Sequence, residues 1–288
     1  MVELSRLIGE KDAGRKIKYF VRSDLKVSYH QYCAMKNSGG LKVNGEIVHA
    51  DYILQSGDAV TACLPDPGAE KNVLPEPGEL TIAYRDDDLV ILDKPAPLAC
   101  QCTPKQPGGT LENRFAAHFG CVFRPLNRLD KGTSGLMAAA LHPHSCQLLQ
   151  RQLHSDSFIR EYLAVVDGEM HGEGTIDLPI AKDASATVRR IIDHENGQRA
   201  ITHYRVEETG PRSIVRLRLE TGRTHQIRVH LSALGHPIVG DFLYGSETPE
   251  LPGRFALHST RIALRHPLTG ETIDISSPLP EELRRLVP

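Results

Sequence analysis

The stretch RPLNRLDKGTSGLMAAAL, residues 124–141, places a charged pair directly before a turn and an apolar run. Arg128 and Asp130 stand one residue apart, and the small residues of KGTSG follow them. The apolar run 136–141 predicts a buried strand, and the small residues predict the turn that leads into it. Neither feature needs the charged pair. An aspartate in this position serves most often as a turn residue that bonds the backbone, so other motifs must decide its role.

The composition is that of a soluble globular protein. The chain has 288 residues, of which 40% are hydrophobic and 24% are charged, and this is the usual range. It has no apolar run near the ~20 residues that cross a bilayer, and its first residues lack the apolar core of a signal peptide. The six cysteines are scattered without a Cys-x-x-Cys pair. We therefore expect a cytoplasmic protein with reduced thiols and no membrane partner.

The charge pattern permits a polyanionic partner. The formal net charge is −2, whereas nucleic-acid-binding domains are usually basic. Residues 189–230, however, carry nine arginines and five acidic residues. A basic groove can lie on an otherwise acidic body.

Proline and glycine mark a boundary in the chain. The segment LPDPGAEKNVLPEPGE, residues 64–79, holds four prolines and two glycines, which resist both helix and sheet. We predict a small domain over 1–64, a linker over 65–78 and a large domain over 79–288.

The small domain shows two helices and a hairpin. Apolar residues recur at helical spacing from Ile17 to Leu25, and Ser28 with Gln31 forms a capping-box pattern that starts a second helix. Asn44-Gly45 predicts a hairpin turn. The basic residues are either a solvated helix face or contacts to phosphates. They are Arg15, Lys16, Lys18, Arg22, Lys26 and Lys36.

The large domain alternates strands with a few helices. The predicted strands are 80–84, 89–93, 136–141, REYLAVVDGEM at 160–170 and two antiparallel strands within 201–222. The predicted helices are 111–118 and 145–154. A further helix lies in GRTHQIRVHLSALGHPIVGD, residues 222–241. We expect Thr224 to cap it and Gly235 to end it. Arg223 and Arg228, off the apolar stripe, would form an anion site at its start.

Four motifs together resemble the RluA group of pseudouridine synthases. They are NRLDKGTSGL, REYLAVVDG, GRTHQIRVHLSALGHPIVGD and FALHSTRIAL, in that order, and LDKPAPL with Lys94 is similar to another segment of the group. The helices and hairpin of the small domain resemble the S-four RNA-binding module. The resemblance implies an α+β fold: a mixed, mostly antiparallel sheet with a central cleft, preceded by a small α+β RNA-binding module. It also implies an enzyme that isomerises uridines in structured RNA.

The resemblance assigns a role to each residue that matches its motifs. Asp130 matches the catalytic aspartate, and Arg228 matches the arginine that pairs with it. Tyr162 matches the tyrosine that stacks on the target base, Arg128 the basic residue that enters the RNA stack, and Leu257 a packing leucine at the site. Whether the aspartate attacks the sugar as a nucleophile or takes a proton as a base stays open.

The reaction fits this short list of groups. The ribose–uracil bond breaks, the base rotates and carbon 5 joins the sugar, so we expect no cofactor. Two residues depart from the group's pattern. Asn127 replaces a histidine before Arg128, which suffices if that position only orients the loop, and Asp93 stands where asparagine is usual. His225 and His230 are five apart on the predicted helix and face different directions, so we expect no metal.

Two other functions remain as alternatives. A non-catalytic RNA-binding or ribosome-assembly factor could keep the fold, and a nucleoside hydrolase would release free uracil. The hydrolase would need a second carboxylate to activate water, which no motif supplies. We expect structured RNA as the partner, ribosomal RNA rather than transfer RNA, and a monomer.

Overall fold

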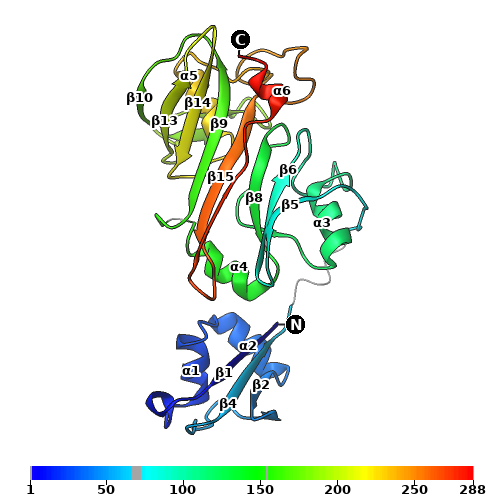
Figure 1. Cartoon of the computed structure of the whole chain (residues 1–288), viewed down its shortest axis with the longest axis vertical. Helices are drawn as coiled ribbons and strands as arrows, with labels where there is room; N and C mark the ends of the chain where they lie inside the picture. Colours follow the sequence, from blue (N-terminus) through cyan, green and yellow to red (C-terminus); the bar gives the residue numbers. More distant parts are fainter. Residues whose placement is uncertain (1, 67–72, 154, 288) are drawn as a thin grey trace.

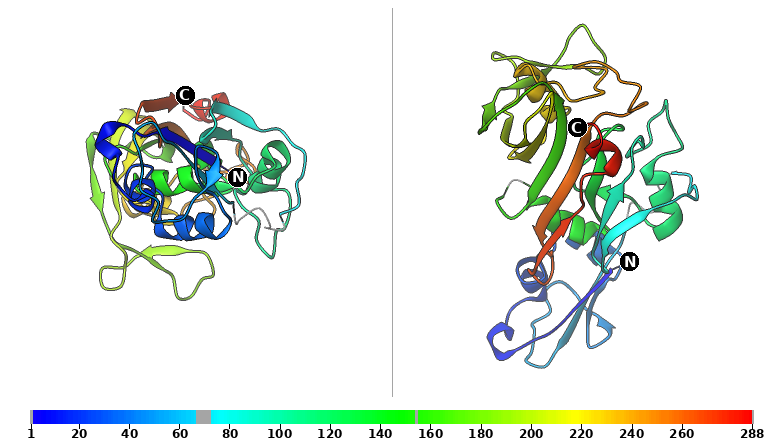
Figure 2. Two further views of the ribbon diagram at one scale, coloured as in Figure 1. Left: turned by 90° about the horizontal axis from the view of Figure 1, so that it is seen from below. Right: turned by 45° about the horizontal axis from the view of Figure 1, so that its top comes forward.

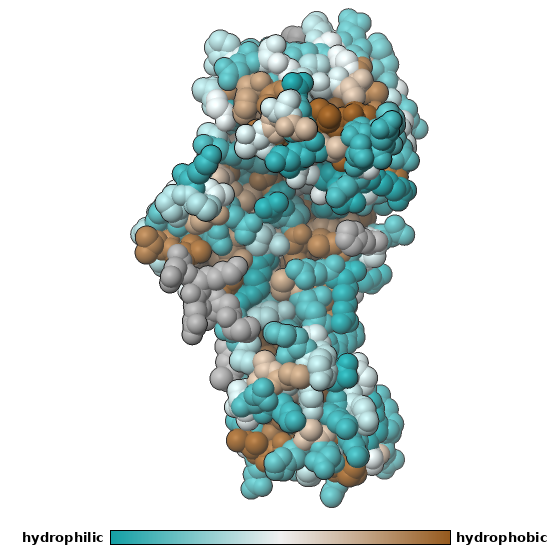
Figure 3. Space-filling view, turned by 180° about the vertical axis from the view of Figure 1, so that it is seen from behind, coloured by the Kyte–Doolittle hydropathy of each residue, from teal (hydrophilic) through white to brown (hydrophobic). Residues whose placement is uncertain are grey.

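The computed structural model describes residues 2–66, 73–153 and 155–287. The chain is elongated, with its first 64 residues at one end and the larger part at the other (Figure 1). Its rear surface is largely hydrophilic with scattered hydrophobic side chains (Figure 3). None of the helices within these residues has the length and apolarity to cross a membrane.

Residues 2–64, here called the N-terminal module, form a four-stranded antiparallel sheet in the order β1-β4-β2-β3. Its elements are β1 (Val2–Leu7), a 3-10 turn η1 (Glu10–Asp12), α1 (Ile17–Ser23), α2 (Tyr29–Asn37), β2 (Leu41–Val43), β3 (Glu46–Ile47) and β4 (Ala59–Leu64). The predicted capping box at Ser28 and the Asn44-Gly45 turn, with φ of 51° and 87°, are both confirmed. Strand β1 was not predicted, because most of its residues are exposed and its sequence gives little apolar signal.

The larger part is built on one ten-stranded sheet in the order β10-β13-β14-β9-β15-β8-β6-β5, with β16 beside β15 and β7 beside β8. Among the described strands, β15 and β8 alone pair in parallel, so the predicted mixed, mostly antiparallel α+β fold is confirmed. The strands are β5 (Thr81–Arg85), β6 (Leu89–Lys94), β7 (Arg124–Pro125), β8 (Ser134–Ala140), β9 (Ile159–Asp167), β10 (Glu173–Asp177), β13 (Ile201–Glu208), β14 (Arg212–Leu219), β15 (Leu257–Arg265) and β16 (Thr272–Ser276).

Four helices and a hairpin complete this part. The helices are α3 (Leu111–Phe119), α4 (Pro143–Gln150), α5 (Gln226–Ala233) and α6 (Glu281–Arg284). Helix α4 begins before the predicted residue 145 and ends before the predicted 154, which lies outside the described residues. Strands β11 (Ile180–Lys182) and β12 (Arg190–Ile192) pair as a hairpin that projects from the body, in yellow-green in the left view of Figure 2.

The central strands are buried on both faces because helices or strands cover each side. Alternate residues of β6 show this: Val90 and Leu92 join the cluster that holds residues of α3 and α5. Leu89 and Ile91 join a second cluster that holds residues of α4 and β16. This explains why the central strands read as continuous apolar runs.

The N-terminal module has its own apolar cluster and lies against α4 (Figure 1). The Gln147 side chain accepts the Ser28 backbone N–H at 3.2 Å and donates to the Lys26 carbonyl at 3.3 Å. Arg124 forms an ion pair with Asp66. The predicted linker 65–78 lies partly outside the described residues, at 67–72, so the domain limits stay a prediction.

Candidate active site

All five residues that the sequence singled out line one cleft of about 540 Å³. Arg128 and Asp130 lie in the loop between β7 and β8, Tyr162 in β9, Arg228 in α5 and Leu257 at the start of β15. The cleft therefore gathers side chains from three strands or loops and one helix, and the most distant pair, Arg128 and Leu257, is 129 residues apart in sequence.

Buried hydrogen bonds fix the loop that carries Asp130. The Thr133 backbone N–H donates to the Asp130 carbonyl at 3.0 Å, and the Leu98 N–H donates to the Lys131 carbonyl at 2.9 Å. Gly135 is required at the end of this loop: its φ is 105°, and a Cβ there would lie 2.3 Å from the Ser259 carbonyl oxygen. The KGTSG segment thus lets β15 approach β8 closely.

Lys94 holds the same loop through hydrogen bonds to backbone carbonyls. Its side chain is fully buried, and Nζ donates to the carbonyl of Leu98 at 2.8 Å and to that of Pro95 at 3.0 Å, with the Lys131 carbonyl at 3.5 Å. Burial lowers the pKa of Lys94 from 10.5 to about 8. The Lys-Pro segment therefore holds backbone around the site, while its amine stays out of the cleft.

Arg228 bridges two carboxylates. Its Nη1 donates to Asp130 Oδ2 at 2.9 Å, while Nε and Nη2 donate to the two oxygens of Asp241 at 2.7 and 2.8 Å. The guanidinium also lies 4.2 Å from the Phe255 ring centroid and 5.0 Å from that of Tyr244. The prediction that Arg223 and Arg228 form an anion site is therefore wrong. Arg228 is buried and already donates to Asp130 and Asp241. Arg223 donates through Nε to the Arg199 carbonyl.

The start of α5 also differs from the expectation. His225, not Thr224, is the N-cap, and it makes no side-chain capping bond. Gln226 instead anchors this turn: its Oε1 accepts the Arg223 N–H at 3.0 Å, and its Nε2 donates to the Ile201 carbonyl at 2.9 Å. The predicted end is confirmed, with Gly235 at φ 83°.

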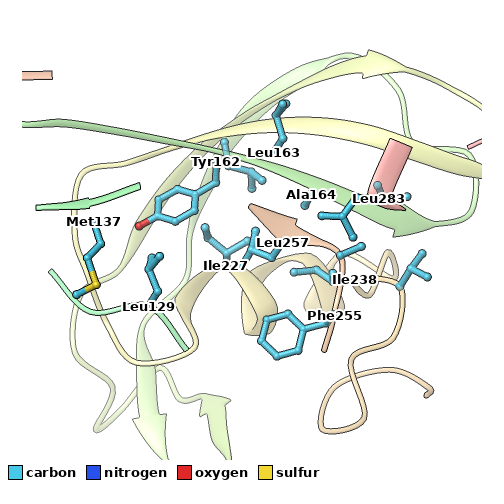
Figure 4. Packing of buried hydrophobic residues seen from close by; sticks show 14 of the residues in the cluster. Leu129, Met137, Tyr162, Leu163, Ala164, Ile227, Ile238, Phe255, Leu257 and Leu283 are labelled. Carbon is cyan, nitrogen blue, oxygen red and sulfur yellow. The ribbon is translucent and has the colours of Figure 1, made fainter. Parts of the chain in front are cut away.

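Apolar side chains form part of the cleft wall. The Tyr162 ring lies beside Leu129, Ile227 and Leu257 (Figure 4), all members of one buried cluster. Burial raises the pKa of the Tyr162 hydroxyl, so the phenol stays neutral in the cleft. A flat apolar ring next to a carboxylate–guanidinium pair can receive a planar base while its sugar faces the carboxylate.

The remaining residues of the predicted set have distinct surroundings. Arg128 is exposed and lines the cleft. Asn127 is buried, and its Oδ1 accepts the Ala138 N–H at 3.3 Å, which is the loop-orienting contact that an asparagine can make. Asp93 accepts the Ser277 hydroxyl at 2.6 Å and thus ties β6 to the C-terminal segment.

One cluster outside the cleft has the residue types of a metal site, but the nitrogen that would bind the metal carries a proton. Asp86, Asp88 and His266 place their ligand atoms within 4.8 Å of one another. The His266 Nδ1 accepts the backbone N–H groups of Leu268 and Thr269 at 3.3 and 3.1 Å. Its Nε2 therefore carries the proton and donates toward the two carboxylates. We interpret the cluster as an internal hydrogen-bond network.

With this geometry in place, comparison with known proteins identifies the family. The profile of RNA pseudouridylate synthases matches residues 88–233, about half of the chain. The chain belongs to the RNA pseudouridylate synthase family. It is 37% identical to the RNA pseudouridine synthase YhcT of Bacillus subtilis, over 98% of this chain and 96% of that protein. It is also 37% identical to ribosomal large subunit pseudouridine synthase D of Haemophilus influenzae, over 72% of this chain and 70% of that one.

Solved structures of RNA pseudouridylate synthases agree with the fold. Human RNA Pseudouridylate Synthase Domain Containing 1 is 30% identical and superposes with a TM-score of 0.59, over 70% of this chain and 86% of that one. These findings confirm the predicted RluA-type family and an isomerase that acts on RNA. They favour the catalytic function over a non-catalytic RNA-binding factor.

Proposed function

We propose that Asp130 is the catalytic carboxylate and that the substrates are specific uridines of ribosomal RNA. One observation carries the assignment of the residue: the Asp130 carboxylate lies in the cleft, 2.9 Å from a buried guanidinium and among the walls that Tyr162 and Leu257 form. Because Arg228 holds the carboxylate in one rotamer, the carboxylate can face C1′ of every ribose that binds in the cleft.

The chemistry needs few groups. The bond between ribose C1′ and uracil N1 breaks, and the uracil keeps the electron pair. The base then turns, C5 bonds C1′, the proton on C5 is lost and N1 gains one, so no atom is added or removed overall. Asp130 serves as a nucleophile at C1′ or as a base toward the sugar. Because a base inside a helix is out of reach, the uridine is flipped into the cleft, where Tyr162 stacks on it and Arg128 fills the vacated place in the RNA.

We propose further that the N-terminal module is an S-four-like RNA-binding domain that ends near residue 64. Lys16, Arg22, Lys26 and Lys36 are exposed on or beside its two helices. Arg22 lies 5.3 Å from the ring of the exposed Tyr29, and paired basic and aromatic groups suit single-stranded or looped RNA. Arg15 is removed from the predicted set, because it pairs with Asp12 and with Asp24 at 2.7 Å.

The similarity to several ribosomal large subunit pseudouridine synthases supports ribosomal RNA as the target. We propose that the protein acts as a monomer on this RNA in the cytoplasm.

The experiment is a map of pseudouridines across total RNA from a deletion strain complemented with wild type or with Asp130→Asn. We expect one or more ribosomal sites to return only with wild type. Sites that return with both proteins would refute the role of Asp130, and sites confined to transfer RNA would refute the ribosomal target.

A further inference from the structure

His225 is a polar side chain of the cleft to which the assignments above give no role. It lines the cleft, and its Nε2 lies 3.8 Å from Asp130 Oδ2. Its backbone is left-handed, with φ 58° and ψ 18°, which is uncommon for a residue other than glycine. Strained backbone of this kind persists where the surrounding structure requires it, and it often occurs at functional sites.

The partners of the imidazole define which nitrogen carries the proton. His225 Nδ1 lies 2.8 Å from the Tyr244 hydroxyl oxygen. That oxygen also accepts the Arg190 backbone N–H at 2.8 Å. A phenol oxygen can accept more than one hydrogen bond, but Nδ1 is the one acceptor that the described residues place beside the Tyr244 hydroxyl proton, so we assign that proton to the bond with Nδ1. A neutral imidazole that accepts at Nδ1 carries its proton on Nε2, the atom that faces the cleft.

The surroundings keep this imidazole neutral. Burial lowers the pKa of His225 most. Asp130 from the β7–β8 loop and Asp241 from the loop after α5 favour the charged form, whereas Arg228 of α5 and Arg190 of β12 oppose it. The two carboxylates are also already paired with Arg228, as described above, which weakens their pull on His225.

We propose that His225 is a hydrogen-bond donor of the active site, which presents Nε2–H to a carbonyl oxygen of the uracil when the base leaves C1′. The inference rests on the proposed role of Asp130, because it places the breaking bond beside that carboxylate. The leaving base takes on negative charge, and a fixed donor in a partly apolar cleft stabilises it. Tyr244 acts as a positioning residue that holds the imidazole in this tautomer.

The first test measures the tautomer directly and needs no RNA. In protein labelled with ¹⁵N-histidine, long-range proton–nitrogen NMR distinguishes a protonated from an unprotonated ring nitrogen, and the signal that disappears in His225→Asn belongs to His225. We expect a protonated Nε2 and an unprotonated Nδ1 at neutral pH, and loss of this fixed pattern in Tyr244→Phe. A protonated Nδ1 with a free Nε2, or a charged ring, would overturn the proposal.

The second test measures turnover. Asparagine tolerates the left-handed backbone but is too short to bring a donor into the cleft, whereas the amide of His225→Gln reaches the place of Nε2. With [5-³H]uridine-labelled total RNA from a deletion strain, we expect His225→Asn to lower kcat by about 100- to 1,000-fold, the range for one lost donor, with little change in KM. We expect His225→Gln to recover most of this loss. Equal activity of the two variants would contradict a donor at Nε2.

The third test separates the uracil from Asp130 as the acceptor. Fluorine at C5 stabilises the uracil anion, so RNA that carries 5-fluorouridine depends less on a donor for the departing base. The defect of His225→Asn, measured on both RNAs as disappearance of the original nucleoside in chromatography of the digested RNA, should be smaller on this RNA. A defect of equal size on both RNAs would overturn the proposal. If Asp130→Asn retained activity while the tautomer was as stated, the proposed function would fail and the position of the proton would stand.

Discussion

Asp241 holds Arg228 from the side opposite to Asp130. The two residues form a paired contact, Nε to Oδ2 at 2.7 Å and Nη2 to Oδ1 at 2.8 Å, and both side chains are buried. Asp241 also accepts the backbone N–H of Leu243 at 3.0 Å and that of Tyr244 at 3.3 Å. Because Asp241 holds both Nε and Nη2, the guanidinium points Nη1 at Asp130. Asp241 therefore determines the orientation in which Arg228 binds Asp130.

Substitution of Asp241 by asparagine should lower both activity and stability. The amide preserves the shape but removes the charge that balances Arg228, and removing one partner of a buried pair costs on the order of 3 kcal/mol. We expect kcat to fall by at least about tenfold with KM nearly unchanged, because the substrate still binds while Asp130 is less well placed. Tritium release and urea unfolding measure the two effects.

The matched control for Asp241 is Asp274→Asn. Asp274 makes the same two-point contact with Arg261, at 2.9 and 2.7 Å, but its side chain is 43% exposed. An exposed pair contributes below about 1 kcal/mol, and this one lies outside the cleft, so the variant should retain full kcat. Equal effects of the two substitutions would contradict a special role for Asp241.

Lys94 should make stability depend on alkaline pH. Its pKa is about 8 in the folded protein and 10.5 as a reference, so between these values the unfolded chain binds the proton that the folded protein has lost. Unfolding free energy then rises with pH through this window. Relative to Lys94→Met, wild type should gain on the order of 3 kcal/mol across this window. Urea unfolding at several pH values measures this difference, and the exposed Lys105→Met should show none. A pH-independent difference between wild type and Lys94→Met would contradict the lowered pKa.

Arg22 should contribute to RNA affinity through charge. Arg22→Glu reverses an exposed charge next to Tyr29, so binding to ribosomal RNA should weaken several-fold. The plot of log affinity against log salt should become less steep by about one unit of slope. Arg285→Glu makes the same change beside α6, whose label lies at the far end of Figure 1. Filter binding at several salt concentrations compares the two. A loss that is equal in both variants would refute the N-terminal module as the RNA-binding surface.

Local patterns predicted most elements of this fold. The capping box at Ser28, the Asn44-Gly45 turn and the glycine that ends α5 each depend on a few neighbouring residues, and apolar runs marked the central strands. The pairing of these strands could not be derived that way, because β15 lies between β8 and β9 although about 90 residues separate it from β9 in sequence. The resemblance supplied that arrangement.

The site was predicted where motifs matched and missed where long-range contacts define the role. Asp130, Arg128, Tyr162, Arg228 and Leu257 do meet in one cleft. Asp241 is the last residue of the motif GRTHQIRVHLSALGHPIVGD, but its contact with Arg228 is visible only in the folded chain. Thr224 was favoured as a cap because its hydroxyl suits that position, whereas Gln226 and the left-handed His225 shape the turn instead. Such outcomes depend on β13 and on Tyr244, which are distant in sequence.

The most direct test of the central claim is tritium release from ribosomal RNA labelled at uridine C5, comparing wild type with Asp130→Asn. Release reports the loss of the C5 proton that accompanies the new C5–C1′ bond. We predict multiple turnovers for wild type and none above background for the variant, with the variant folded and still bound to the RNA. Release by folded Asp130→Asn at a rate near that of wild type would contradict the account.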